Sequence, residues 1–321
     1  MSAERHNRAR CITLVTALTM LLASCERSRP SQPARTPPPA AEEPAIPVSP
    51  RATSTLWDSS AGPVLLARGP SAAKAFVVFP EYSDSTVPDT LQLDASPLRG
   101  DFVQLIGRSG KLDSVLVMSA GIKQWAGDEC VEWPTATLGV GKDSTPTAGW
   151  TVGFVQPHVV PIPLDSLAGL PSPDSARLAA DITRLASALP DDTTHTFRGI
   201  PFAVRYAYEF QPVPGVQAII ADLVRRLNQE ASPLEEHTIL IAERANDSSD
   251  TPYHVAYHER TGGSEETIET TEVLAAVRFA SPSRTALVLF REGPDSGAYA
   301  LLERSADGQW RLRWTSVHTG C

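Results

Sequence analysis

The chain has 321 residues, of which 42% are hydrophobic and 20% are charged. This composition is typical of a globular protein, and past residue 52 it shows no collagen-like or disorder-like bias. The formal net charge of −9 at pH 7 makes nucleic acids and anionic lipid surfaces poor partners, because both require a concentrated positive face.

The first 24 residues have the pattern of a secretory signal peptide. Arg5, Arg8 and Arg10 precede the thirteen residues 11–23, which are rich in bulky apolar side chains. A permanent transmembrane helix needs about 20 apolar residues to cross the hydrocarbon core of a bilayer. The apolar segment is too short for that, so the sequence predicts an exported protein without a membrane-spanning helix.

The end of this segment resembles the lipobox of bacterial lipoproteins. It reads Leu22, Ala23, Ser24, Cys25, and the resemblance covers residues 1–25 only. It implies that the Cys25 sulfur receives a diacylglyceryl group, that the chain is cut just before Cys25, and that the new amino group is acylated. Two or three acyl chains anchor a protein durably, whereas one gives marginal attachment. The alternative is a general signal peptide in which this cysteine is incidental.

Residues 25–52 are predicted to be a lipidated cysteine followed by a disordered tether. Residues 26–52 hold eight of the chain's 28 prolines and almost no side chains that could form a core. Proline-rich chain favours polyproline II at about 3.1 Å per residue, so the tether could extend to roughly 80 Å. A PxxP ligand for a partner domain is the alternative, but such spacings, as at 30–33 and 47–50, are expected by chance in this composition.

Two of the four cysteines remain, because Cys11 is expected to leave with the signal peptide and Cys25 to be lipidated. In an oxidising envelope compartment, Cys130 and Cys321 are predicted to form a disulfide. Free buried thiols are the alternative. A catalytic role for Cys130 is disfavoured, because the carboxylates at positions 128, 129 and 132 would raise its thiol pKa.

The mature chain from Cys25 onward has 25 basic and 36 acidic residues, a net charge of −11 once Arg5, Arg8, Arg10 and Glu4 are removed.

Residues 53–165 are predicted to be rich in β-strands. Between residues 60 and 160, short apolar runs alternate with clusters of Gly, Pro, Ser and Asp. The stretch 105–117 predicts a hairpin with its turn at 108–111. A phosphate-binding loop is excluded there, because Leu112 stands where that motif requires Ser or Thr.

Residues 166–321 are predicted to hold two helices and then an antiparallel meander, either as a separate region or as one unit with 53–165. Apolar spacing predicts a helix over 172–189 and a second helix over 215–230, separated by a strand at 199–210 whose alternate residues from Ile200 to Phe210 share one side. Strands follow from residue 237, and in the last one Trp310, Leu312 and Trp314 are expected to face inward. The fold class expected is therefore α+β, mainly antiparallel β-sheet with two amphipathic helices in the middle of the chain.

Candidate sites for chemistry are few. His254 and His258 lie in a predicted strand, where they would share a side but stand nearly 14 Å apart, too far to bind one ion, at about 3.4 Å per residue. Carboxylates accompany a histidine at 191–195 and at 235–237, where a cation site is possible but solvated surface charge is favoured. His158 lies between prolines and could orient a base or close a turn. No metal, cofactor or catalytic residue is assigned, since no HExxH, EF-hand or GxSxG pattern occurs.

The sequence thus favours a lipid-anchored cell-envelope protein that acts as a non-catalytic binding or structural module for an envelope protein or polymer. In a Gram-negative host the outer membrane is favoured, because Glu26 replaces the aspartate associated with inner-membrane retention; the periplasmic or surface side is left open. An anchored hydrolase of envelope polymers and a small-molecule or metal-binding protein are the alternatives. A catalytic cluster in a cleft would favour the hydrolase, a broad apolar patch the macromolecular partner, and a pocket with convergent polar groups the small ligand.

The anchor predicts a labelling result. Radiolabelled palmitate should enter the wild-type protein and should not enter Cys25→Ala, because the acyl chains are attached through Cys25. Cys11→Ala is the matched control and should label as wild type, since Cys11 leaves with the signal peptide. A wild-type protein that takes up no label would contradict the anchor.

Overall fold

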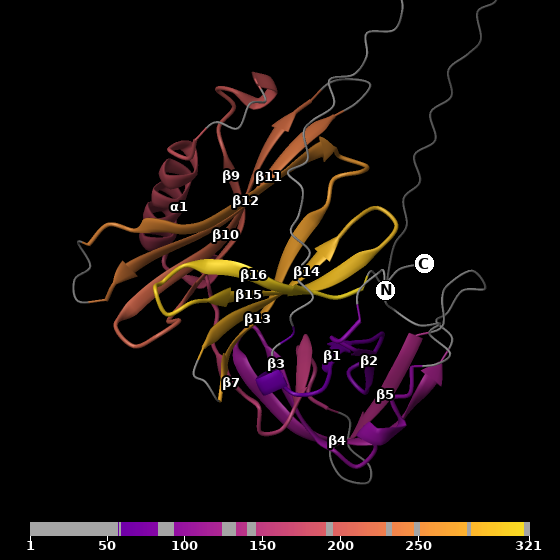
Figure 1. The fold of residues 1–321 in the computed structure, drawn as a ribbon. Helices are drawn as coiled ribbons and strands as arrows, with labels where there is room; N and C mark the ends of the chain where they lie inside the picture. Colours follow the sequence, from indigo (N-terminus) through magenta and orange to yellow (C-terminus); the bar gives the residue numbers. More distant parts are fainter. Residues whose placement is uncertain are drawn as a thin grey trace, which may run out of the picture. The chain divides into compact units, whose positions relative to one another are not determined.

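The computed structural model describes residues 57, 59–82, 93–123, 133–139, 146–190, 195–228, 233–246, 251–280 and 284–317. Residues Ile46–Cys321 form one compact unit, to which all of these belong (Figure 1). Cys25, Cys130, Cys321 and the proline-rich segment lie outside the described residues. Within the described part, no helix has both the length and the apolar character needed to cross a membrane.

The first part of the unit is a closed antiparallel barrel with the strand order β1-β2-β5-β4-β3-β6. Its strands are β1 (Leu65–Arg68), β2 (Lys74–Val78), β3 (Phe102–Gly107), β4 (Gly110–Lys123), β5 (Trp133–Gly139) and β6 (Val152–Val155). The predicted hairpin is confirmed as β3 and β4, joined by a turn at 108–109. Gly110, which starts β4, has φ 106, a conformation that favours glycine.

Two five-stranded antiparallel sheets follow. The inner sheet has the order β16-β15-β14-β13-β7, and the outer sheet has the order β12-β11-β10-β9-β8. The inner sheet contains β7 (Val159–Ile162), β13 (Thr270–Phe279), β14 (Thr285–Glu292), β15 (Gly297–Arg304) and β16 (Trp310–Thr315). The outer sheet contains β8 (Asp165–Ser166), β9 (Ala203–Phe210), β10 (Val216–Leu227), β11 (Leu234–Ala245) and β12 (His254–Ser264).

The described residues contain one α-helix, α1 (Ser172–Ser187), which confirms the first predicted helix. Its buried face is formed by Leu178, Ile182 and Ala186, and Pro173 lies in its first turn, where the missing N–H costs nothing. Four 3-10 turns complete the elements: η1 (Ser59–Ala61), η3 (Ser96–Leu98), η4 (Leu167–Gly169) and η5 (His195–Phe197).

These elements stack in four layers: α1, the outer sheet, the inner sheet and the barrel (Figure 1). The helix packs on the outer sheet through Ile182 and Ile219. The opposite face of the outer sheet packs on the inner sheet, where Ile220 and Leu287 share one apolar cluster. The other face of the inner sheet packs on the barrel wall, in a cluster shared by Phe154 and Val288 among others, while the barrel interior holds a cluster of its own. The inner sheet is therefore buried on both faces.

The predicted second helix over 215–230 is wrong, because this segment is the strand β10. Eight consecutive residues, 218–225, are buried; Ile219, Ala221 and Leu223 pack toward α1, and Ala218 and Ile220 pack toward the inner sheet. A strand covered on both faces is a continuous apolar run, which periodicity alone does not separate from a buried helix. The fold is thus predominantly antiparallel β, with two sheets and a barrel, rather than an α+β fold with two amphipathic helices.

Bulges also break the alternation expected from the sequence. In the 199–210 strand, Val204 packs toward α1, whereas Tyr206 and Phe210 pack toward the inner sheet, because Arg205 is an extra residue in the β9–β10 ladder. In β16, Trp310 faces the outer sheet and Trp314 faces the barrel. Both tryptophans are buried as expected, but on opposite faces.

Gly153 provides a test of the barrel packing. A Cβ at this position in β6 would lie 2.9 Å from Val103 Cγ1 and 3.1 Å from Leu105 Cδ2, inside the barrel. Gly153→Ala should therefore lower the free energy of unfolding by about 1–3 kcal/mol, the usual cost of overpacking. The measurement is the midpoint of urea unfolding. Gly121→Ala in β4, where a Cβ meets nothing within 4 Å, is the control and should leave the midpoint nearly unchanged. Equal midpoints for the two variants would contradict this packing.

Candidate functional site

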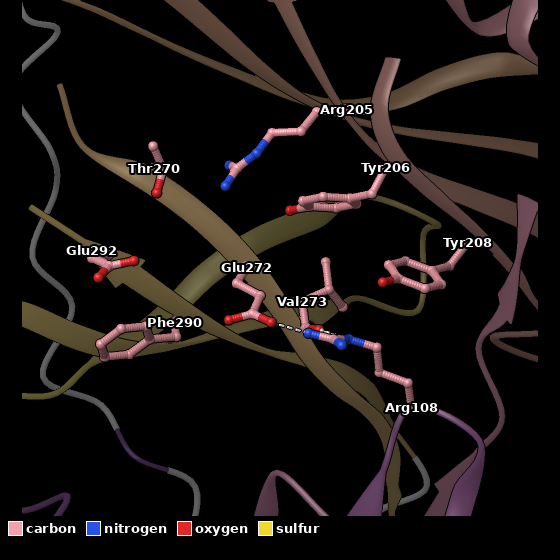
Figure 2. A pocket seen from close by; sticks show the side chains of 9 residues that line it. All are labelled: Arg108, Arg205, Tyr206, Tyr208, Thr270, Glu272, Val273, Phe290 and Glu292. Atoms are coloured by element: carbon pink, nitrogen blue, oxygen red, sulfur yellow. Dashed lines mark hydrogen bonds and ion pairs between the residues drawn. The ribbon is translucent and has the colours of Figure 1, made fainter. Parts of the chain in front are cut away.

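A pocket of about 180 Å³ lies where the barrel and the two sheets meet (Figure 2). Strand β9 forms one wall, β13 and β14 form another, and the turn between β3 and β4 contributes an arginine. Its lining is Arg108, Arg205, Tyr206, Tyr208, Thr270, Glu272, Val273, Phe290 and Glu292. The pocket is therefore polar and charged, with aromatic rings on two sides.

The pocket exists because β13 is only partly paired on one side. Among the described strands, β7 is the neighbour on that side, and it pairs only with Ala276–Phe279. The carbonyl groups of the remaining part accept hydrogen bonds from side chains instead. Tyr206 Oη donates to Thr271 O at 2.7 Å, Arg108 Nε donates to Val273 O at 2.8 Å, and Thr151 Oγ1 donates to Leu274 O at 2.7 Å.

Arg108 is held in place by this strand edge. In addition to its bond with Val273 O, it forms an ion pair with Glu272 and stacks over the Tyr208 ring at 5.8 Å. The Arg108 and Glu272 side chains are 33% and 54% exposed, so the ion pair alone adds little stability. Because its guanidinium is committed to these neighbours, Arg108 serves as a wall of the pocket.

Arg205 is oriented by the bulge in β9. In the ladder with β10, Tyr206 is opposite Asp222 and Val204 is opposite Leu223, so Arg205 has no partner residue there. A bulge of this kind re-aims a side chain and is frequent beside functional sites. Arg205 Nη1 binds Asp222 Oδ2 at 3.0 Å, and the arginine side chain is 45% exposed while Asp222 is fully buried. Figure 2 shows Arg205 extending from β9 toward the side of the pocket that Thr270 lines.

Behind Arg205 lies a chain of ionic hydrogen bonds within the outer sheet. Asp222 binds His237 Nδ1 at 3.2 Å, His237 Nε2 binds Glu235 Oε2 at 3.0 Å, and Glu235 Oε1 binds Arg226 Nε at 2.5 Å. Burial alone would lower the pKa of His237, but the hydrogen bonds and negative charges of Asp222 and Glu235 outweigh it and raise the pKa. Charged His237 then donates from both ring nitrogens.

Tyr206 stays protonated at the pocket wall. Burial raises the pKa of its hydroxyl, and the negative charge of Asp222 raises it further. The hydroxyl is thereby fixed as the donor to Thr271 O. The Tyr206 and Tyr208 rings lie 5.6 Å apart and present apolar surface beside the charged groups.

The structure places two of the histidines proposed from sequence in structural roles. The His158 ring packs against Gly62, where a Cβ would lie 3.1 Å from His158 Cδ2, and His158 O accepts from Ala280 N–H at 3.0 Å. His158 therefore packs on Gly62 and continues the pairing between β7 and the end of β13. The expectation of solvated surface charge at 235–237 is wrong, because Glu235, Glu236 and His237 are only 5%, 4% and 3% exposed.

His254 and His258 do not form a shared site. His254 and His258 lie in β12 as predicted, but they do not share a side, because an extra residue, Ala256, breaks the alternation. His254 is opposite Glu243 and His258 is opposite Leu240. His195 begins η5, and the rest of the 191–195 cluster lies outside the described residues.

No set of three or more His, Cys, Asp or Glu side chains among the described residues is arranged to hold a metal ion. In the His237 cluster, the two carboxylates bind opposite nitrogens of one ring, so they do not converge on a point. The cluster therefore supports the sheet and Arg205.

Sequence reasoning missed the pocket residues. Arg108 was placed in a turn, and Tyr206 and Tyr208 were expected on an apolar face, without any sign that they would meet β13. Arg205 looked like an ordinary polar residue of an alternating strand. No sequence signal identifies Arg205, because a bulge in a strand of alternating aromatic residues has no distinct sequence pattern.

Comparison with known proteins gives no indication of a function, so the proposal below rests on the sequence and on the geometry of this pocket. No protein-family model, curated protein or solved structure matches the chain.

The His237 cluster predicts a pH-dependent stability. Because the folded-state pKa of His237 is raised, its charged form stabilises the fold fully below its unfolded pKa of about 6.5, and this contribution is lost as pH rises through the folded pKa. His237→Gln should lower the free energy of unfolding by about 3 kcal/mol below pH 6.5 and by progressively less above it. Urea unfolding between pH 5.5 and 9 measures this difference.

His254→Gln is the matched control, because His254 is exposed on β12. Its stability relative to wild type should vary little over the same pH range. A His237→Gln difference that stays constant from pH 5.5 to 9 would refute the charged state of His237.

Proposed function

We propose that this protein is a lipid-anchored binding protein of the cell envelope that takes a small polar ligand in the pocket between β9, β13 and β14. The lipobox-like sequence ending at Cys25 and the proline-rich segment after it support the anchor and the tether. Glu26 supports the outer membrane as the address in a Gram-negative host.

The observation that carries the binding role is the convergence of polar groups on one small cavity. Arg205, Thr270, Glu272 and Glu292 come from three strands of two sheets and line the same space. Binding sites typically combine apolar and aromatic walls with a few placed polar groups. A volume of about 180 Å³ is below the range of about 300–1,000 Å³ for drug-sized ligands, which supports a small ligand.

The hydrogen bonding of His237 and Tyr206 supports a binding role for these two groups rather than proton transfer. A general base needs a free lone pair within reach of its substrate. His237 has both ring nitrogens engaged by carboxylates, and the Tyr206 hydroxyl donates to a backbone carbonyl. These groups hold Arg205 and β13 in place, so their role is to preorganise the pocket.

A pocket-filling variant tests this function. Full-length protein in detergent micelles is incubated with the small molecules extracted from the cells that produce it, then washed and examined by native mass spectrometry. Wild type should retain a compound that Thr270→Trp retains at least about tenfold less, because the indole fills the space beside Arg205.

Thr261→Trp is the control, since Thr261 is also a half-buried strand residue but lies on β12. It should retain the compound as wild type does. Equal retention by Thr270→Trp, or no retained compound in any of the three proteins, would refute a ligand pocket at this place.

A further inference from the structure

We infer that the ligand of this pocket is an amino-acid-sized zwitterion, whose carboxylate binds Arg205 and whose ammonium group binds on the side of Glu292 and Thr270. This inference rests on the proposed binding function and names its ligand class. It follows from the opposite charges that Arg205 and Glu292 bring to one pocket.

The positive end of the pocket is Arg205. With His237 charged, its chain of ionic bonds contains three cations, Arg205, His237 and Arg226, and two carboxylates, Asp222 and Glu235. The excess positive charge is therefore not neutralised within the chain. The exposed members are the two arginines at its ends, and of these Arg205 lines the pocket.

Arg205 is suited to a carboxylate. Arg205 Nη1 donates a hydrogen bond to Asp222. The rest of the planar guanidinium offers further N–H donors in a fixed geometry that matches two carboxylate oxygens. Because the bond to a fully buried aspartate fixes its orientation, little side-chain entropy is lost when an anion binds.

The negative end of the pocket is Glu292. It lies directly opposite Thr270 in the ladder between β13 and β14, so a carboxylate and a hydroxyl stand side by side. No ion pair between described residues involves Glu292, whereas Glu272 is paired with Arg108. An ammonium group is compact and donates three hydrogen bonds, which a carboxylate and a hydroxyl accept.

The two ends select against ligands of a single charge. An anion on Arg205 would lie in the same small cavity as Glu272 and Glu292, and a cation beside Glu292 would lie in the same cavity as Arg205. A dipolar ligand satisfies both ends. Tyr206 and Phe290 also line this cavity and offer ring surface to a short apolar side chain.

Isothermal titration calorimetry on the full-length protein in detergent tests the ligand class. The probes are L-leucine, N-acetyl-L-leucine, which has no ammonium group, and L-leucinamide, which has no carboxylate. L-leucine should bind, and each capped analogue should bind at least about tenfold more weakly. The dipeptide alanyl-alanine, whose charged groups lie farther apart, is the fourth probe. Tighter binding of L-leucine indicates a free amino acid as the ligand, and tighter binding of alanyl-alanine indicates the charged ends of a peptide.

Two variants test which residue binds the carboxylate of the ligand and which binds its ammonium group. Arg205→Gln should weaken L-leucine at least about tenfold without weakening L-leucinamide, while Glu292→Gln should weaken L-leucine without weakening N-acetyl-L-leucine. Glu292 lies at the exposed end of β14, so its variant keeps the fold even if loss of the Asp222 bond destabilises Arg205→Gln. Arg311→Gln and Glu266→Gln, at exposed positions outside the pocket, are the controls and should bind as wild type.

The outcomes separate this inference from the binding function. Capped analogues that bind as well as L-leucine, a Glu292→Gln affinity equal to wild type, or no binding of L-leucine or alanyl-alanine would overturn the zwitterion. The binding function would still stand if native mass spectrometry finds another compound whose retention Thr270→Trp abolishes. If that compound is also missing, both proposals fail.

Discussion

Burial of the inner sheet on both faces is the constraint on which this structure depends. Its central strands contact the barrel on one side and the outer sheet on the other, in two separate apolar clusters. Residues such as Val288 and Leu287 are therefore both fully buried although they point in opposite directions. At about 25 cal/mol per Å² of apolar surface, such two-sided burial is the largest favourable contribution that a sheet makes. It also fixes the position of the barrel and the outer sheet relative to each other.

The pocket is a consequence of this stacking. Among the described strands, the short β7 pairs with only four of the ten residues of β13, so the rest of β13 has no neighbouring strand on that side. Side chains from β9 and from the barrel hairpin complete the hydrogen bonding there. The same groups that satisfy the strand edge become the walls of a cavity. Arg205 enters it because a bulge in β9 turns it away from regular alternation. A structural irregularity and an unfinished edge together thus produce the one group of converging charges on which function is proposed.

Local signals predicted the parts of the fold that local interactions determine. The hairpin and the first helix follow from turn residues, proline and 3.6-residue spacing, and both are confirmed, the turn at 108–109 within the predicted 108–111 and the helix at Ser172–Ser187 within the predicted 172–189. The strand β10 was mistaken for a helix, because burial on both faces removes the period of two. Arg205 and the buried state of His237 were missed because they depend on a bulge and on which strands become neighbours. Neither is encoded within a short window of sequence.

The side-chain bonds along β13 have a consequence for crowded molecules. A bare strand edge is a template on which a strand of another chain can add, and proteins that present one are prone to aggregate. The carbonyls of Thr271, Val273 and Leu274 already accept hydrogen bonds from Tyr206, Arg108 and Thr151. An incoming strand would have to displace all three donors, so this part of β13 is protected against strand addition.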